Sequence, residues 1–159
     1  MHLLQAIIAF LGRVCLGAVF LALGAHIFFD WPGSELYLTR ALNDWMTITM
    51  GHESLQQIVE QGVHASSLLL GVALCCILLG SLLLLLGWWV RVGALLLLLV
   101  AVVATPLVYP FWTVNGLEAQ MQSALFVKNL GIIGGLLLLV AYGKGNGRKV
   151  SVSSDKSSD

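Results

Sequence analysis

A lysine and an arginine each interrupt a long apolar run of this sequence. Lys128, followed by Asn129, lies near the start of the run from Met121 to Tyr142, and Arg13 lies inside the run from Leu3 to Phe29. A charged side chain within a bilayer costs at least about 2 kcal/mol, so it must reach water, a counter-ion or a hydrogen-bonding group. Arg13, Lys128 and Asn129 are therefore predicted to form a buried polar site. Arg13 either holds oxygen atoms of neighbouring helices or binds an anionic or carbonyl-bearing group.

Glycines follow both cations at helical spacing. Gly131 and Gly135 share a helical face with Lys128, and two further glycines share a face with Arg13. Small residues let helix backbones approach closely in lipid, so both charges are expected to face protein. Arg13 is at least about 15 Å from either end of its run, which predicts a position near the centre of the bilayer.

A second set of polar residues is predicted to cluster at the outer side of the membrane. His26 and Asp30 are four residues apart, as are Glu60 and His64, so each pair shares a helical face. These residues either bridge helix ends to water and headgroups, or help to bind a small molecule such as a quinone headgroup. Such pairs also resemble metal ligands of helical bundles. No metal site is assigned, because His26 and Asp30 straddle the end of a run.

The sequence contains three cysteines, Cys15, Cys75 and Cys76, all in apolar surroundings. An apolar environment disfavours the reactive thiolate, so they are interpreted as small packing residues. The alternative is a redox pair between Cys15 and the vicinal cysteines, since both positions are expected near the middle of the membrane. No C-x-x-C motif supports that pairing.

The sequence carries no self-contained catalytic motif. It has no phosphate-binding loop, dinucleotide fingerprint, haem-attachment sequence or recognisable nucleophile motif. Eight basic residues balance eight acidic ones, so no basic field indicates nucleic acid as a partner. Whether the protein is an enzyme is left open.

The elements that must position these residues are membrane-spanning helices. The chain is 58% hydrophobic and only 10% charged, whereas soluble domains carry about 25% charged residues. Four apolar runs predict an all-α fold, a four-helix transmembrane bundle with spans at about 3–29, 62–89, 92–109 and 121–142. Apolar residues at three- and four-residue spacing predict a short amphipathic helix over 34–50 in the first loop, followed by a polar helical piece over 52–61.

The distribution of basic residues predicts the orientation. Residues 1–143 form the membrane domain, and residues 144–159 form a polar tail that is expected to be disordered. Both termini are expected in the cytoplasm, because the second loop and the tail hold most of the basic residues. They are Arg91, Lys144, Arg148, Lys149 and Lys156.

Three short stretches combine glycine, leucine and a basic residue in a recognisable order. They are Leu11-Gly12-Arg13-Val14 with Gly24-Ala25-His26, Gly80 with Leu82 to Gly87 and Arg91-Val92-Gly93-Ala94, and Phe126-Val127-Lys128-Asn129-Leu130 with Gly134-Gly135-Leu136-Leu137. Together these stretches resemble the DoxX family, whose members are four-helix proteins of the bacterial inner membrane. The resemblance extends over nearly the whole chain to Gly143.

The resemblance implies a role in a redox complex. Relatives include the DoxD subunit of thiosulfate:quinone oxidoreductase and membrane partners of thiol-redox and superoxide-detoxifying proteins. By resemblance, Arg13, Lys128 and Asn129 are the residues that carry function. The chain departs from the family pattern at His26, near which many relatives have a lysine, and at Ile77, where many have a glutamate.

The leading hypothesis is therefore a membrane component of a thiol- or quinone-linked redox complex. It predicts contact with the bilayer, with a soluble or membrane redox partner and with quinone, and it leaves open whether the protein forms a homo-oligomer. A non-catalytic scaffold or anchor is the alternative, with a docking surface around Leu42 and Trp45. A small-solute transporter is a third, although no clear inverted repeat is present.

Overall fold

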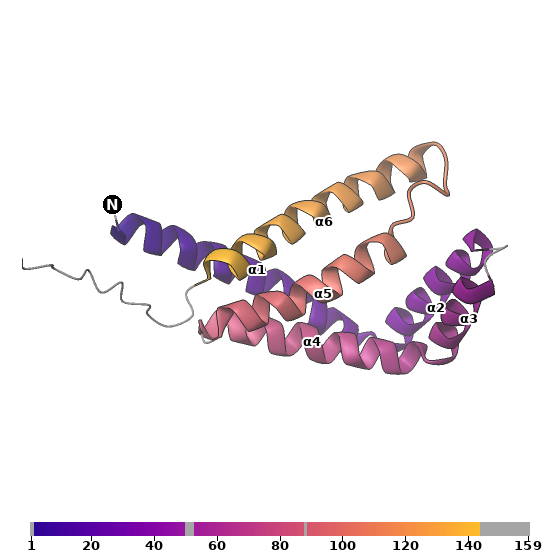
Figure 1. Cartoon of the computed structure of the whole chain (residues 1–159), viewed down its shortest axis with the longest axis horizontal. Helices are drawn as coiled ribbons and strands as arrows, with labels where there is room; N and C mark the ends of the chain where they lie inside the picture. The colour runs from indigo at the N-terminus through magenta and orange to yellow at the C-terminus, as the bar shows by residue number, and fades with distance from the viewer. Residues whose placement is uncertain (1, 50–52, 88, 144–159) are drawn as a thin grey trace, which may run out of the picture.

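The computed structural model describes residues 2–49, 53–87 and 89–143. The polar tail predicted for residues 144–159 lies outside the described residues. Six helices are described (Figure 1). They are α1 (His2–Phe29), α2 (Trp31–Ile48), α3 (Glu53–His64), α4 (Ser66–Leu86), α5 (Val90–Val108) and α6 (Leu117–Tyr142).

Four of these helices are long and apolar enough to cross a membrane, which confirms the predicted all-α fold with four spans. They are α1 over Ile7–Phe29, then α4, α5 and α6 over their full lengths. The predicted amphipathic helix is α2, and it begins earlier than expected because Asp30 accepts a hydrogen bond from the Gly33 amide at 3.3 Å. The polar piece is α3, which ends at His64 and is separate from α4.

The spanning helices pack in chain order. α1 contacts α4, α4 contacts α5, and α5 contacts α6. A tight turn joins α4 to α5, with Gly87 in the left-handed conformation at φ +71°. We call the end of the bundle with this turn and Gly143 the hairpin end. The opposite end, with α2, α3 and residues 109–116, is the loop end (Figure 1).

Glycines set how closely the helices approach. A Cβ atom at Gly80 would lie 3.0 Å from the carbonyl oxygen of Gly93, and one at Gly93 would lie 2.8 Å from the Gly80 oxygen. The backbones of α4 and α5 are therefore in direct contact. The α1 residue Gly17 packs on Leu85, and Gly24 packs on α4 near Leu78. The buried core lies beside these contacts and includes Phe20, Ile77, Leu84, Leu97 and Leu136.

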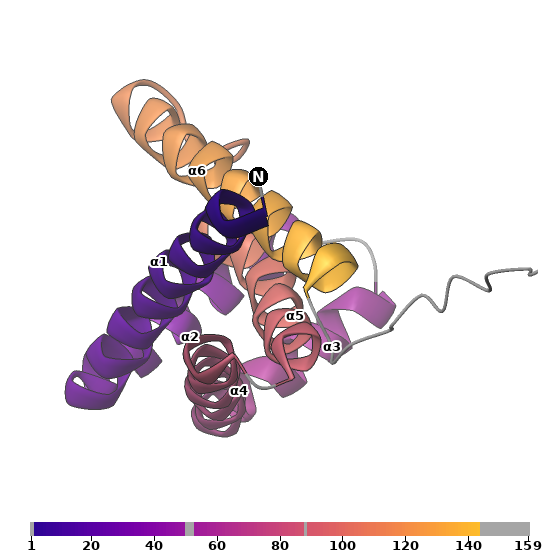
Figure 2. The ribbon, with the colours of Figure 1, turned by 90° about the vertical axis from the view of Figure 1, so that its left-hand side faces the viewer.

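The first and last helices meet only near the hairpin end. A Cβ atom at Gly135 of α6 would lie 3.5 Å from the Leu16 side chain of α1. From there the two helices cross and diverge toward the loop end (Figure 2). The four spans consequently form a row that is open on one side at the loop end, and α6 is the least buried of them.

Helix α2 uses its apolar face inside the protein. Ala41 and Leu42 are buried, and Leu42 lies against Gly62 of α3. Trp45 is half-buried against the loop between α5 and α6. The docking surface expected around Leu42 and Trp45 is therefore corrected: these residues hold α2 on the bundle.

Candidate functional site

Arg13 lies at the hairpin end, and its expected position near the centre of the membrane is corrected. A Cβ atom at Gly87 would lie 3.4 Å from Nη1 of Arg13. The beginning of α1 extends past the α4–α5 turn, which places Arg13 beside the C-terminus of α4. Such an end carries about half a negative charge, which a guanidinium offsets. The Nε atom of Arg13 is buried without a hydrogen-bond partner among the described residues.

A second arginine, Arg91, holds the other helix end on this side. Its Nε donates to the Gly143 carbonyl at 2.7 Å, and Nη2 donates to that of Ala141 at 3.4 Å. The C-termini of α4 and α6 therefore each have an arginine beside them. The sequence analysis used Arg91 only as one of the basic residues that predict the orientation. The sequence signal for this contact was that Arg91 comes just after the α4–α5 turn, opposite the end of the last span.

Lys128 lies in the loop-end half of α6 and is exposed. It shares a helical face with Gly131 and Gly135, as the sequence predicts. Gly135 meets Leu16 of α1, but a Cβ atom at Gly131 would have nothing within 4 Å. Lys128 therefore lies on the face of α6 from which α1 has diverged, and in a bilayer that face is open to lipid.

Asn129 lies on the adjoining face of α6. It is half-buried, and it precedes Ile132 and Leu136 by three and seven residues. Both of those side chains pack in or against the core. Asn129 therefore lies on the side of α6 that faces the bundle, next to the lysine but not on the same face.

Arg13 and Lys128 are at different depths. Leu16 is level with Gly135, and Arg13 is three residues from Leu16 toward the hairpin end. Lys128 is seven residues from Gly135 in the opposite direction. At 1.5 Å per residue, the two cations are about 15 Å apart along the bundle. Lys128 and Asn129 are sequence neighbours on different faces of α6, Lys128 is exposed, and Arg13 lies apart from both, so the three residues do not come together as one buried site.

The four residues of the predicted outer cluster are all exposed. Asp30 caps α2 at Gly33, and His26 lies one turn before it on α1. Glu60 and His64 lie on α3. Within residues 2–49, 53–87 and 89–143, no three potential metal ligands come together.

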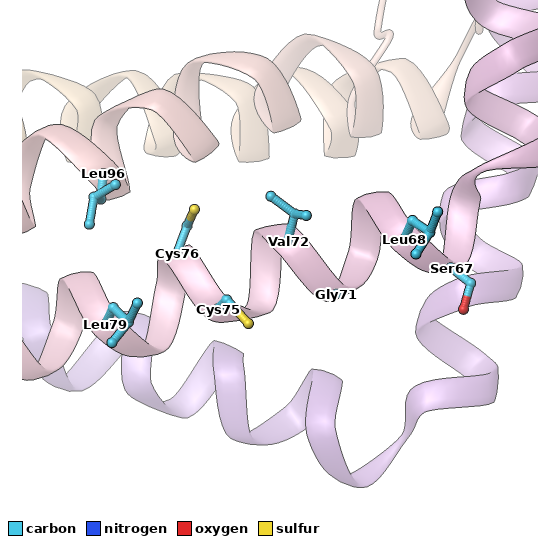
Figure 3. A pocket seen from close by; sticks show the side chains of 8 residues that line it. All are labelled: Ser67, Leu68, Gly71, Val72, Cys75, Cys76, Leu79 and Leu96. Carbon is cyan, nitrogen blue, oxygen red and sulfur yellow. The ribbon is translucent and has the colours of Figure 1, made fainter.

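The three cysteines are free. Cys75 and Cys76 line an apolar groove of about 360 Å³ between α4 and α5, where they point to different sides of α4 (Figure 3). Cys15 is close to Gly17, which packs on Leu85. Leu85 is ten residues, or about 15 Å, from Cys75 along α4. The alternative redox pair between Cys15 and the vicinal cysteines is therefore not formed.

Sequence reasoning missed a cluster of four aromatic residues at the loop end. Trp45 of α2 lies 6.0 Å from Trp112, measured between ring centroids, and Phe126 of α6 lies 6.4 Å from Trp112. Phe111 is 5.1 Å from Trp112 and 5.2 Å from Phe126. We call these four residues the aromatic cluster. The sequence signal for this cluster was the apolar face of α2, together with the pair Phe111-Trp112 just after the third span.

Two polar side-chain atoms of α2 and of the loop-end half of α6 have no hydrogen-bond partner among the described residues. They are Nε1 of Trp45 and Oε1 of Gln122, and both are buried. Phe126 is one turn from Gln122 and two residues from Lys128. The loop-end half of α6 thus carries Gln122, Phe126, Lys128 and Asn129, with Lys128 and Phe126 on different faces of the helix because they are two residues apart.

Comparison with known proteins agrees with this architecture. The DoxX family model matches residues 8–110, which is more than half of the chain and runs from α1 to the end of α5. The helix that carries Lys128 lies beyond the match. Neither the curated proteins nor the solved structures compared with the chain gave a match. The fold and the family match lead to one conclusion: this integral membrane protein belongs to the DoxX family.

Proposed function

We propose that this DoxX protein is the membrane component of a redox complex and that it contacts quinone through Lys128. The observation that carries the proposal is the exposure of Lys128 on a glycine-containing face that α1 leaves open. A quinone dissolved in the bilayer reaches such a face laterally, without passing through the protein. Once there, the ammonium group donates hydrogen bonds to a quinone carbonyl.

The depth of Lys128 supports this assignment. The side chain lies in the loop-end half of α6. A lysine in a span needs a polar partner, and a carbonyl-bearing ring provides one where a lipid chain does not. Asn129 adds an amide on the adjoining face. Arg13 is too far along the bundle to touch the same ring and instead supports the end of α4.

We place the protein in the bacterial inner membrane with the hairpin end and both termini in the cytoplasm. Arg13 and Arg91 both lie at the hairpin end, beside the C-termini of α4 and α6. The positive-inside rule favours the cytoplasm for the side with more basic residues. In this orientation Lys128 is in the outer leaflet, and the electron donor or partner protein meets the loop end.

Replacing Lys128 tests the proposal. In the native complex, Lys128→Met is expected to lower quinone reduction at least about tenfold, because a charge-assisted hydrogen bond is lost. Lys128→Arg, which keeps the charge, is expected to retain part of the activity. Arg40→Met removes an exposed cation of α2 and serves as the control. Unchanged quinone reduction by a folded Lys128→Met protein contradicts the proposal.

A further inference from the structure

An asparagine stands directly before a glycine in the loop between α5 and α6. Asn115 and Gly116 are both exposed, and neither belongs to a helix, since α6 begins at the next residue, Leu117. Gly116 has a positive φ of +70°, and a Cβ atom built on it would have nothing within 4 Å. The pair is therefore open to water, with no neighbouring side chain crowding the glycine.

The backbone nitrogen of Gly116 is free to react. Among the described residues, it donates no hydrogen bond to a backbone carbonyl. The hydrogen bond that ties Gly116 to α6 uses its oxygen, which accepts from the Gln120 amide at 3.3 Å. A peptide N–H without a partner loses its proton to hydroxide more readily than a bonded one. Because glycine has no Cβ atom, it also leaves room for a carbonyl carbon to approach this nitrogen.

The electrophile within reach is the side-chain amide of Asn115 itself. Attack of the Gly116 nitrogen on Cγ of Asn115 forms an N–Cγ bond, closes a cyclic imide and releases the side-chain nitrogen as ammonia. Water then opens the imide at one of its two C–N bonds. Opening at the new bond gives aspartate, and opening at the original peptide bond gives isoaspartate. Water is the co-reactant, and no electron is transferred.

The asparagines inside helices lack these features. Asn43 lies in α2 and Asn129 in α6, and each is followed by a residue with a side chain. Within an α-helix the following amide is hydrogen-bonded to the carbonyl four residues earlier, which removes the free nucleophile. The side chain of the following residue also hinders attack. Asn115 therefore differs from both in its conformation as well as in its neighbour.

From these observations we infer that Asn115 is a site of spontaneous deamidation. The modification places a carboxylate immediately before α6. Gly116 is the N-cap of α6 and gives the helix no side-chain hydrogen bond, so the first N–H groups of the helix carry a partial positive charge beside the new carboxylate. The inference is independent of the proposed function, because Asn115 takes no part in the contact at Lys128.

Ageing of the purified full chain in detergent, followed by peptide mapping with mass spectrometry, tests the inference. Heavy-oxygen water labels the carboxylate that forms during ageing. The peptide with Asn115 is expected to give two products of equal mass, aspartate and isoaspartate, which chromatography separates. Conversion is expected to be faster at mildly alkaline than at neutral pH, because the attacking nitrogen must lose its proton. The peptides with Asn43 and Asn129 are expected to stay unchanged over the same time.

Two variants separate the chemistry from the surroundings. Gly116→Ala places a methyl group beside the attacking nitrogen and is expected to slow conversion at least about tenfold. Asn115→Gln keeps the amide but requires a larger ring, so it is expected to stay unconverted. Alanine is strained at a φ of +70°, and thermal unfolding checks that Gly116→Ala is folded. Asn115→Gln provides a readout that does not depend on that variant.

A second asparagine–glycine pair serves as the chemical reference. Asn146 and Gly147 lie outside the described residues, in the same chain and the same solution. Conversion of Asn115 in the wild type, slowed in Gly116→Ala, supports the inference. An Asn115 peptide that stays intact, whether or not the reference pair converts, overturns it, as does equal conversion in the wild type and folded Gly116→Ala. Quinone reduction by Lys128→Met bears on the proposed function alone, so the two proposals fail separately.

Discussion

At the scale of single residues, the clearest contact is the clamp that Arg91 forms on the end of α6. Its guanidinium bonds the Gly143 carbonyl at 2.7 Å across 52 residues of sequence. Arg91→Met is expected to lower the free energy of unfolding by about 1–2 kcal/mol, because a charge-assisted hydrogen bond to a helix end is lost. Thermal unfolding in detergent measures the change. Arg40→Met is the control, and an equal loss in both variants argues against the clamp.

Residue types alone singled out candidate side chains but did not show where they lie. Lys128 shares a helical face with Gly131 and Gly135 because that relation depends only on helical periodicity. The depth of Arg13 could not be predicted in the same way. It depends on the register between α1 and α4, which contacts such as Gly17 with Leu85 and Gly24 with Leu78 determine. Hydropathy does not encode that register.

At the scale of elements, α4 and α5 depend on two glycines. A Cβ atom at Gly80 would lie 2.8 Å from the Leu97 side chain and 3.0 Å from the Gly93 oxygen. Gly80→Val is therefore expected to force the helices apart and cost about 1–3 kcal/mol of stability. Gly134 on α6 has nothing within 4 Å of a built Cβ, so Gly134→Val is the matched control and is expected to change little. Equal thermal unfolding of the two variants contradicts the packing described.

Attachment of α2 is expected to weaken at high pH. Partial burial, and to a lesser extent the neighbouring Tyr109, raise the pKa of Tyr37 above its ordinary value of 10.0. The folded state therefore keeps the proton longer than the unfolded state. The contribution of Tyr37 to the free energy of unfolding is therefore fully present below pH 10, and it is lost as the pH rises from there through the raised pKa.

Comparison with Tyr37→Phe checks this pH dependence. The variant has no phenol at this position to ionise, so its unfolding temperature is expected to fall less between pH 9 and pH 11 than that of the wild type. Tyr142 is exposed at the far end of α6, and Tyr142→Phe is expected to keep the alkaline loss. An identical alkaline loss in the wild type and Tyr37→Phe would show that Tyr37 does not contribute.

Elements were predicted better than their contacts. Long apolar runs located the four spans, and apolar residues at three- and four-residue spacing located α2. Both signals are local in the sequence. The aromatic cluster joins residues from α2, the loop after α5 and α6, and no local pattern specifies that Trp45 meets Trp112. Sequence reasoning also treated the apolar face of α2 as a surface, since a single chain does not show which amphipathic face is covered.

At the scale of the whole molecule, the row of four spans is closed at the hairpin end and open at the loop end. Disulfide trapping in a cysteine-free background tests this shape. Cysteines at positions 16 and 135 (Leu16→Cys with Gly135→Cys) are expected to cross-link under mild oxidation, because these residues meet. Leu23→Cys with Lys128→Cys, seven residues nearer the loop end on each helix, is expected not to cross-link. Efficient cross-linking of the second pair indicates a closed bundle and removes the lateral path to Lys128.

The measurement that tests the central claim most directly is purification of the protein from its native membrane in mild detergent. Mass spectrometry would then quantify the proteins and lipophilic cofactors that accompany the wild type and Lys128→Met. We expect an oxidoreductase and stoichiometric quinone with the wild type, and the same oxidoreductase with much less quinone in the variant. Phospholipid alone with the wild type, or equal quinone in both preparations, would contradict a quinone contact at Lys128.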